Sequence, residues 1–97
     1  AYDVPTLAVA VPGTLGYERL DLSWTDAGSD ETGYEIDRST DGATWTPVHT
    51  AAADVLTWQD SGLAATTAYY YRVRATVPGG HATAWSYTAS ETTEPAP

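Results

Sequence analysis

The sequence predicts an all-β domain, a seven-stranded antiparallel β-sandwich, and three observations lead to this prediction. Hydrophobic and polar residues alternate in short runs, turn-forming Gly, Pro and Asp separate these runs, and no stretch has a helical period. The chain has 97 residues, which suffice for one domain with one core. It contains no cysteine, so the packed core must stabilise the fold without disulfides.

The first two strands are expected in the first quarter of the chain. Residues 7–11 alternate leucine and valine with alanine until Pro12 ends the run, which predicts an edge strand. In the stretch 20–24, two leucines and Trp24 face one side while aspartate and serine face the other. This second run has the clearest strand pattern in the sequence.

Three further strands are expected in the middle of the chain. A polar loop over 26–32 precedes a third strand over 34–39. The dipeptide Asp41-Gly42 favours a hairpin turn, because glycine adopts positive φ readily, and it leads into a fourth strand over 44–49. Hydrophobic residues alternate again over 56–59, which predicts the fifth strand.

The two last strands are separated by a Pro-Gly-Gly turn. The sixth, over 67–77, is the longest, and the seventh is expected over 84–92. We expect strands one, two and five to form one sheet and strands three, four, six and seven the other, with the termini at opposite ends. The domain is predicted to span 1–92, and 93–97 to begin a Pro/Thr-rich linker.

The charge of the chain argues against two classes of partner. Thirteen acidic residues and four arginines, with no lysine, give a formal net charge of −9. Such a surface repels nucleic acid phosphates and anionic membranes, so we expect neither as a partner. No apolar run is long enough to cross a membrane. We expect a monomer whose partners are neighbouring domains of the same polypeptide.

No arrangement of residues indicates catalysis or a cofactor. The only histidines, His49 and His81, follow a strand end and occupy a Gly-rich turn, far from any pattern of a nucleophile with its base. The loop 26–31 carries three carboxylates, and oxygen ligands at such spacing can hold calcium. It does not match the twelve-residue calcium-loop pattern, so a solvated loop is the preferred interpretation and no metal site is predicted. Calcium stays open as the alternative.

Four stretches, in order, resemble the fibronectin type III domain. They are Leu-Asp-Leu-Ser-Trp at 20–24, Gly-Tyr-Glu-Ile-Asp-Arg-Ser at 33–39, Gly-Leu at 62–63, and Thr-Ala-Tyr-Tyr-Tyr-Arg-Val-Arg-Ala at 67–75. The resemblance is to the modules of secreted bacterial enzymes that degrade polysaccharides or other polymers. It implies an immunoglobulin-like sandwich without catalytic residues, in a secreted, extracellular protein.

The resemblance also implies roles for particular residues. Leu63 and Tyr69 would form a tyrosine corner, in which the Tyr69 hydroxyl bonds backbone between residues 63 and 66. Together with the alternation pattern it predicts a core of Trp24, Tyr34, Ile36, Leu56, Trp58, Leu63, Tyr69, Tyr71 and Val73. The remaining candidates for contact with a ligand are Tyr17, Trp45, Tyr70 and Trp85, although cross-strand packing is the preferred interpretation of these aromatic residues.

Two functions follow as alternatives. The first is a non-catalytic spacer or interaction module of a larger secreted, bacterial multidomain enzyme or surface protein. The second is a carbohydrate-binding module, in which exposed aromatic rings stack on sugar rings and bind polysaccharide weakly. A stand-alone enzyme is disfavoured, because no residues for its chemistry are in evidence.

Overall fold

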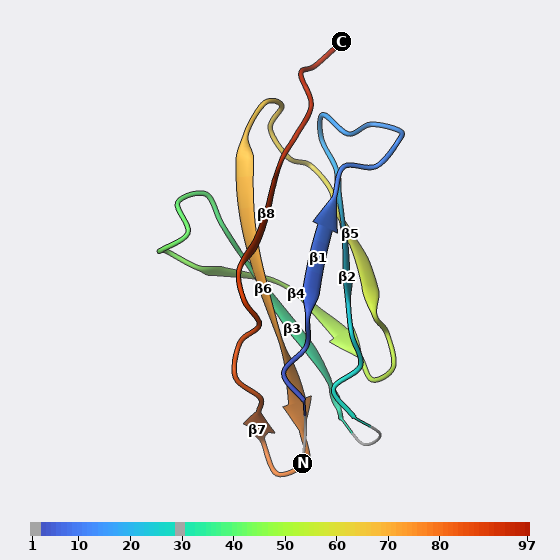
Figure 1. Ribbon diagram of the computed structural model, residues 1–97, viewed down its shortest axis with the longest axis vertical. Helices are drawn as coiled ribbons and strands as arrows, with labels where there is room; N and C mark the ends of the chain where they lie inside the picture. Colours follow the sequence, from blue (N-terminus) through green and yellow to red (C-terminus); the bar gives the residue numbers. More distant parts are fainter. Residues whose placement is uncertain (1–2, 29–30) are drawn as a thin grey trace.

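The computed structural model describes residues 3–28 and 31–97, and these fold into two antiparallel sheets packed face to face (Figure 1). The described residues form eight strands, one more than predicted: β1 Leu7–Ala10, β2 Leu20–Trp24, β3 Gly33–Ser39, β4 Thr46–Ala52, β5 Thr57–Asp60, β6 Ala68–Val77, β7 His81–Ala82 and β8 Ala89–Thr92. The described part of the chain includes no helix able to cross a membrane.

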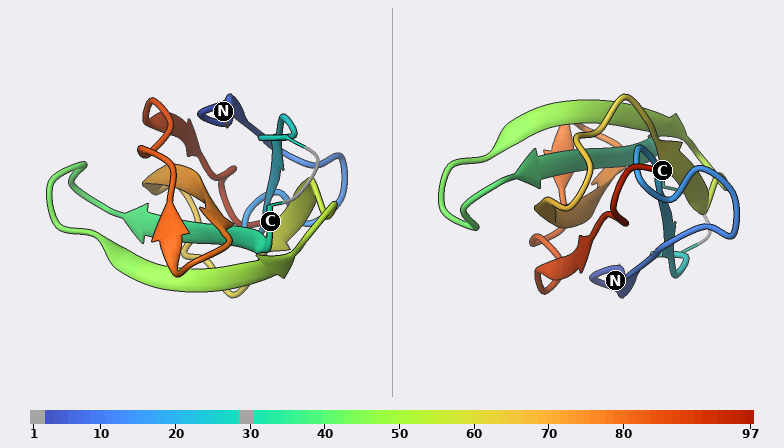
Figure 2. Two further views of the ribbon diagram at one scale, coloured as in Figure 1. Left: turned by 90° about the horizontal axis from the view of Figure 1, so that it is seen from below. Right: turned by 90° about the horizontal axis from the view of Figure 1, so that it is seen from above.

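The strands are distributed between the sheets as predicted. The smaller sheet has the order β1-β2-β5, and the larger has the order β4-β3-β6-β7, with β8 also paired to β6. The two layers are seen end-on in Figure 2. Along one open side of the sandwich, β1 and β8 lie next to each other (Figure 1). The fold class predicted from alternation and turns is therefore confirmed.

The last predicted strand, 84–92, is wrong in its extent, because the chain pairs with β6 as two short strands instead. Gly79 and Gly80 have φ of +88° and +77°, and this tight turn starts β7 already at His81. Between β7 and β8, two hydroxyl groups interrupt the regular ladder. The Ala75 N–H donates to Thr83 Oγ1 over 3.1 Å, and the Val73 N–H donates to Ser86 Oγ over 3.0 Å.

The fourth strand also differs from its predicted range, 44–49, since it begins at Thr46 and continues to Ala52. A β-bulge explains part of the difference. Ile36 faces His49 while the next residue of β3, Asp37, faces Pro47, so β4 has one extra residue at this point. Alternation alone does not reveal such an insertion, because the extra residue shifts the alternation of β4 by one position.

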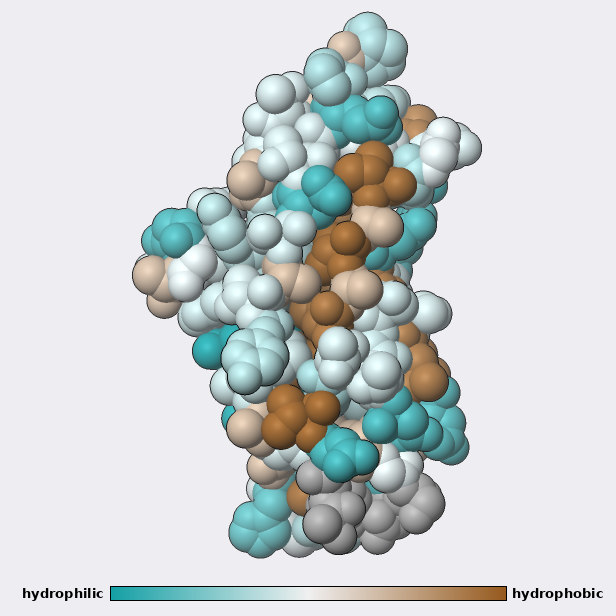
Figure 3. Space-filling model, in the orientation of Figure 1, coloured by the Kyte–Doolittle hydropathy of each residue, from teal (hydrophilic) through white to brown (hydrophobic). Residues whose placement is uncertain are grey.

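The core lies between the sheets and is dominated by aromatic and branched side chains. The buried hydrophobic residues are Leu20, Leu22, Trp24, Ala27, Tyr34, Ile36, Ala51, Leu63, Tyr69, Tyr71, Val73 and Ala75. The Trp24 and Tyr34 rings are 5.7 Å apart and tilted by 51°, a favourable aromatic pair. Along the β1 side, Figure 3 shows a continuous hydrophobic stripe, consistent with the half-buried Leu7, Val9 and Val11.

Two residues predicted for the core lie at its margin instead. Leu56 and Trp58 are half-buried and pack against the core cluster. Trp58 faces inward beside Leu22, but β5 is the edge strand of the smaller sheet, so its side chain reaches the open side of the sandwich. There its ring stacks on His49 of β4, with 4.5 Å between ring centroids and 4° between planes.

A polar link joins the two sheets inside this otherwise hydrophobic core. Asp60, at the end of β5, accepts hydrogen bonds at Oδ2 from the Tyr71 hydroxyl over 2.7 Å and from Arg38 Nη1 over 2.8 Å. Only 5% of the Asp60 side chain is exposed. Burial, together with the bond to the Asp60 carboxylate, raises the pKa of Tyr71 well above its usual range, so its hydroxyl stays protonated and donates.

The tyrosine corner implied by the resemblance is present. The Tyr69 hydroxyl accepts a hydrogen bond from the Ala64 N–H over 2.9 Å, within the backbone stretch that was expected. The chain turns sharply on both sides of this contact, with φ of +72° at Gly62 and +52° at Thr66. The ring of Tyr69 therefore fixes the path by which the chain crosses from β5 to β6.

Tyr69→Phe is expected to lower the free energy of unfolding by about 1–3 kcal/mol, because it keeps the ring but leaves the Ala64 N–H without its acceptor. Ala64 is exposed, so water can replace part of the lost bond and the lower end of the range is expected. Urea denaturation of the two proteins measures the difference. Identical midpoints and slopes would show that water replaces the hydroxyl completely.

Both ends of the chain are bonded to the body of the sandwich, and they lie at opposite ends of it (Figure 1). Near the N-terminus, the Asp3 N–H donates to the Ala27 carbonyl over 2.9 Å. Near the C-terminus, Thr93 is buried and its hydroxyl donates to the Ala64 carbonyl over 2.6 Å, while the Glu94 N–H donates to the Gly16 carbonyl over 2.9 Å. That the tail begins a linker stays a prediction.

Candidate functional site

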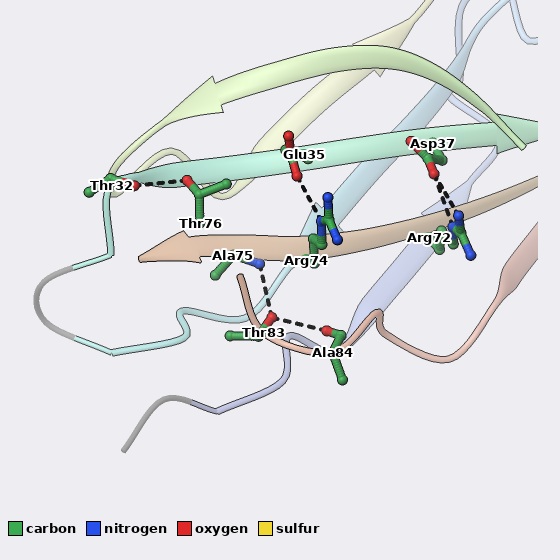
Figure 4. Close-up of polar contacts among 9 residues, drawn as sticks. All are labelled: Thr32, Glu35, Asp37, Arg72, Arg74, Ala75, Thr76, Thr83 and Ala84. Carbon is green, nitrogen blue, oxygen red and sulfur yellow. Dashed lines mark hydrogen bonds and ion pairs between the residues drawn. The ribbon is translucent and has the colours of Figure 1, made fainter. Parts of the chain in front are cut away.

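The outer face of the larger sheet carries the charged and aromatic residues most suited to contact a partner. Strands β3 and β6 pair so that Asp37 lies opposite Arg72 and Glu35 lies opposite Arg74. Arg72 donates from both Nε and Nη2 to Asp37 Oδ2, over 3.0 and 2.9 Å, and Arg74 Nε donates to Glu35 Oε1 over 2.7 Å. Figure 4 shows these two ion pairs side by side across the strands.

Two tryptophans pack against these arginines. The Arg72 guanidinium lies 4.6 Å from the ring centroid of Trp45 and 4.2 Å from that of Trp85, and Arg74 lies 4.4 Å from the Trp85 centroid. Such cation–π contacts stabilise by about 0.5–2 kcal/mol each, depending on exposure. Because the guanidinium groups cover ring area and both rings are half-buried, less of each indole face is free for a ligand.

The other two aromatic candidates have different surroundings. Tyr70 is half-buried, and its ring packs against the turn at Gly42, where a Cβ atom would lie 3.8 Å from the ring. Asp41 holds this turn by accepting from the N–H groups of Thr44 and Ala43, and these bonds keep the pKa of Asp41 well below its usual range. Tyr17 is half-buried in the loop between β1 and β2, two strands of the smaller sheet.

The structure thus brings together Trp45 and Trp85 through Arg72, and it places Tyr17 elsewhere. The two arginines were not among the predicted site residues. They share a face with Tyr70 because they alternate along β6 with Tyr71 and Val73, and this alternation was the available signal. Tyr87 was also missed: it is 96% exposed, and with Val4 and Trp85 it lines a shallow hollow.

Carboxylates gather at a second place, the end of the sandwich near the N-terminus. One carboxylate oxygen from each of Asp26, Glu31 and Asp54 lies within 4.8 Å of the others. The first two belong to the acidic loop noted in the sequence, whereas Asp54 comes from the turn between β4 and β5. Asp30, the third acidic residue of that loop, lies outside the described residues.

The two histidines lie apart from these groups of residues. His49 stacks on Trp58, and His81 is exposed in β7. Neither is hydrogen bonded to a described serine or threonine hydroxyl, so the described residues show no nucleophile activated by a histidine base.

The solved structures that share this fold include parts of two larger enzymes. It matches the β-1,2-glucanase from Parabacteroides distasonis with 26% identity and a TM-score of 0.85, over 100% of this chain and 13% of that one. The pectate lyase Pel3 from Pectobacterium carotovorum shares the fold, with 22% identity and a TM-score of 0.77, over 98% of this chain and 28% of that one. The chain thus spans a small part of each enzyme.

A further solved structure has nearly the same length as the chain. It is an Fn3-like protein from Clostridium thermocellum, with 28% identity and a TM-score of 0.76, over 100% of this chain and 95% of that one. No curated protein sequence matches. The family model described as "Rha78A-like, N-terminal immunoglobulin domain" matches residues 8–95. The chain therefore belongs to the family of Rha78A-like N-terminal immunoglobulin domains and has the fold of a fibronectin type III module.

Proposed function

We propose that this domain is a non-catalytic spacer in a larger, secreted multidomain enzyme that acts on a polysaccharide. The observation that carries the proposal is the placement of the termini at opposite ends of a sandwich whose extents are 46 × 26 × 17 Å (Figure 1). A domain with this layout separates its neighbours by its own length. A module with adjacent termini would instead project from the side of its parent chain.

The bonds at both ends of the sandwich support a stiff spacer. Pro5 is buried before β1, and the Thr6 N–H donates to Thr25 Oγ1 over 2.9 Å, so the entering chain is held against β2. At the exit, the Glu94 N–H donates to the Gly16 carbonyl and the Glu94 carbonyl accepts from the Thr66 N–H. The tail then continues with two prolines, which restrict φ and favour an extended path. Both connections therefore limit how far the neighbouring domains can swing.

The likeness to part of the glucanase supports the proposed parent. In that enzyme a domain of this fold is one part of a much longer chain, and the family description places such a domain at the N-terminal side. We extend this to a secreted parent that degrades a polysaccharide. The net charge of −9 suits a module that must stay soluble and avoid anionic surfaces.

The alternative, a carbohydrate-binding module, would use Trp45, Trp85 and Tyr70 as stacking platforms. The contacts of these rings favour the spacer. Arg72 lies over both tryptophans, and Tyr70 packs against the Gly42 turn, so all three rings already have partners within the domain. A sugar that stacked on the covered faces would have to displace guanidinium groups that are also bonded to Asp37 and Glu35.

The purified domain is therefore expected to migrate without retardation in affinity electrophoresis gels that contain soluble cellulose derivatives, xylan, starch or glycol chitin. The Trp45→Ala and Trp85→Ala variants serve as matched controls and should migrate like the wild type, because no ligand contact is lost. Retardation of the wild type that either variant abolishes would overturn the spacer proposal and establish carbohydrate binding. Tyr87→Ala extends the test to the most exposed ring among the described residues.

A further inference from the structure

The carboxylate cluster at the N-terminal end of the sandwich combines the loop between β2 and β3 with the turn between β4 and β5, two segments that are separate in the sequence. Asp26 follows β2, Glu31 precedes β3, and Asp54 lies in the turn between β4 and β5. The loop after β2 and the turn after β4 lie at the same end of the molecule (Figure 1). One oxygen from each carboxylate lies within 4.8 Å of the other two, so the three groups face a common point.

Glu31 is the member of this cluster whose carboxylate is not fully hydrogen bonded by the described residues. The residue is only 5% exposed, and its Oε1 accepts a hydrogen bond from the Tyr34 hydroxyl over 3.3 Å. Its Oε2 is buried and has no hydrogen-bond partner among the described residues. Buried carboxylate oxygens in folded proteins are nearly always bonded, so this atom lacks a partner that the folded chain would normally supply.

The arginine side chains lie beside carboxylates outside the cluster. All four arginines are described, and they pair with Glu18, Asp60, Asp37 and Glu35, none of which belongs to the cluster. The chain has no lysine. Three carboxylates at this separation repel one another, and the net charge of −9 adds to the repulsion. A cation from outside the chain would remove this repulsion and give Glu31 Oε2 its partner.

We propose that Asp26, Glu31 and Asp54 form a calcium-binding site. The ligands are all oxygen atoms, which Ca²⁺ prefers, and Ca–O distances are about 2.3–2.6 Å. Two ligand oxygens of one ion are at most about twice that distance apart, and the three carboxylate oxygens lie within 4.8 Å of one another. Mg²⁺ requires a near-ideal octahedron at about 2.0–2.1 Å and fits a set drawn from a loop and a separate turn less well.

Hydrogen bonds hold two of the three carboxylates in place. The Gly28 N–H donates to Asp26 Oδ1 over 3.1 Å. The Tyr34 hydroxyl lies 3.2 Å from Asp26 Oδ1 and 3.3 Å from Glu31 Oε1, so its one proton is shared between these two acceptors and links both carboxylates to β3.

The test uses the whole chain, freed of metal with a chelator, and CaCl₂ alone as the probe. Isothermal titration is expected to show one site with a dissociation constant of about 10⁻⁴–10⁻³ M, the range of extracellular calcium modules. The melting temperature should rise more in CaCl₂ than in NaCl of equal ionic strength, which separates binding from screening of the acidic surface. MgCl₂ should have a clearly smaller effect.

Two variants and one control complete the experiment. Asp54→Asn should fold, because asparagine tolerates the φ of +67° at this turn, and it should weaken calcium binding at least tenfold. Glu31→Gln should weaken it similarly. Asp21→Asn makes the same change on β2, outside the cluster, and should bind like the wild type. Equal melting temperatures in CaCl₂ and matched NaCl, or equal calcium responses in Asp54→Asn and Asp21→Asn, would overturn the site.

Discussion

Replacing Trp24 with alanine is expected to cost about 3–5 kcal/mol of the free energy of unfolding, through loss of buried surface and formation of a cavity. Trp24 ends β2, is 5% exposed, and packs its ring against Tyr34 of the opposite sheet at 5.7 Å. No disulfide compensates for the loss, because the chain has no cysteine. Since a whole domain has only about 5–15 kcal/mol, the variant should be partly unfolded at moderate temperature.

Trp58→Ala is the matched control, because it removes the same side chain from a half-buried position at the margin of the core. Its loss of unfolding free energy should be clearly smaller, and should come mainly from the stacking on His49. Urea denaturation followed by circular dichroism measures both variants. If Trp24→Ala melted within a few degrees of the wild type, or if the two variants lost equal stability, Trp24 would not have the central packing role assigned to it.

The predictable parts of the fold are those in which buried and exposed residues alternate along a strand. Strand β2 buries alternate residues without exception, so its sequence pattern is also its structural pattern. The last strand was not predictable in this way. There Thr83 and Ser86 satisfy the backbone of β6 with their hydroxyl groups, so the chain follows β6 without forming a regular ladder. A hydroxyl group that accepts a backbone hydrogen bond in place of a neighbouring strand does not produce a periodic pattern in the sequence.

For the candidate sites, the sequence predicted the face on which single residues lie but not which residues pack together. Alternation placed Tyr70 and the arginines of β6 on the outer face, but the cover that Arg72 provides for Trp45 and Trp85 depends on how distant segments pack. The carboxylate cluster also depends on how distant segments pack. Asp54 is far from Asp26 in the sequence and joins it only because the turn after β4 reaches the loop after β2. Long-range geometry of this kind is the step that pattern reasoning omits.

Asp60→Ala is the second change with a large expected effect, about 3 kcal/mol of unfolding free energy. It would remove the one acceptor shared by Tyr71 and Arg38, which together join the smaller sheet to the larger one. Breaking a buried ion pair by removing one partner costs about 3–5 kcal/mol. The lower end applies here, because 31% of the Arg38 side chain is exposed and water can solvate part of its charge.

A double variant separates the cost of leaving Arg38 unpaired from the cost of losing Asp60. Asp60→Leu combined with Arg38→Met replaces both charges by side chains of similar size, and it should recover a large part of the stability that Asp60→Ala loses. The Tyr71 hydroxyl would still lack its acceptor, so recovery should stay incomplete until Tyr71→Phe is added. Thermal and urea denaturation of the series measure each step. An Asp60→Ala protein as stable as the wild type would mean that the link between the sheets contributes nothing, and a double variant no more stable than Asp60→Ala would exclude the unpaired charge as the cause.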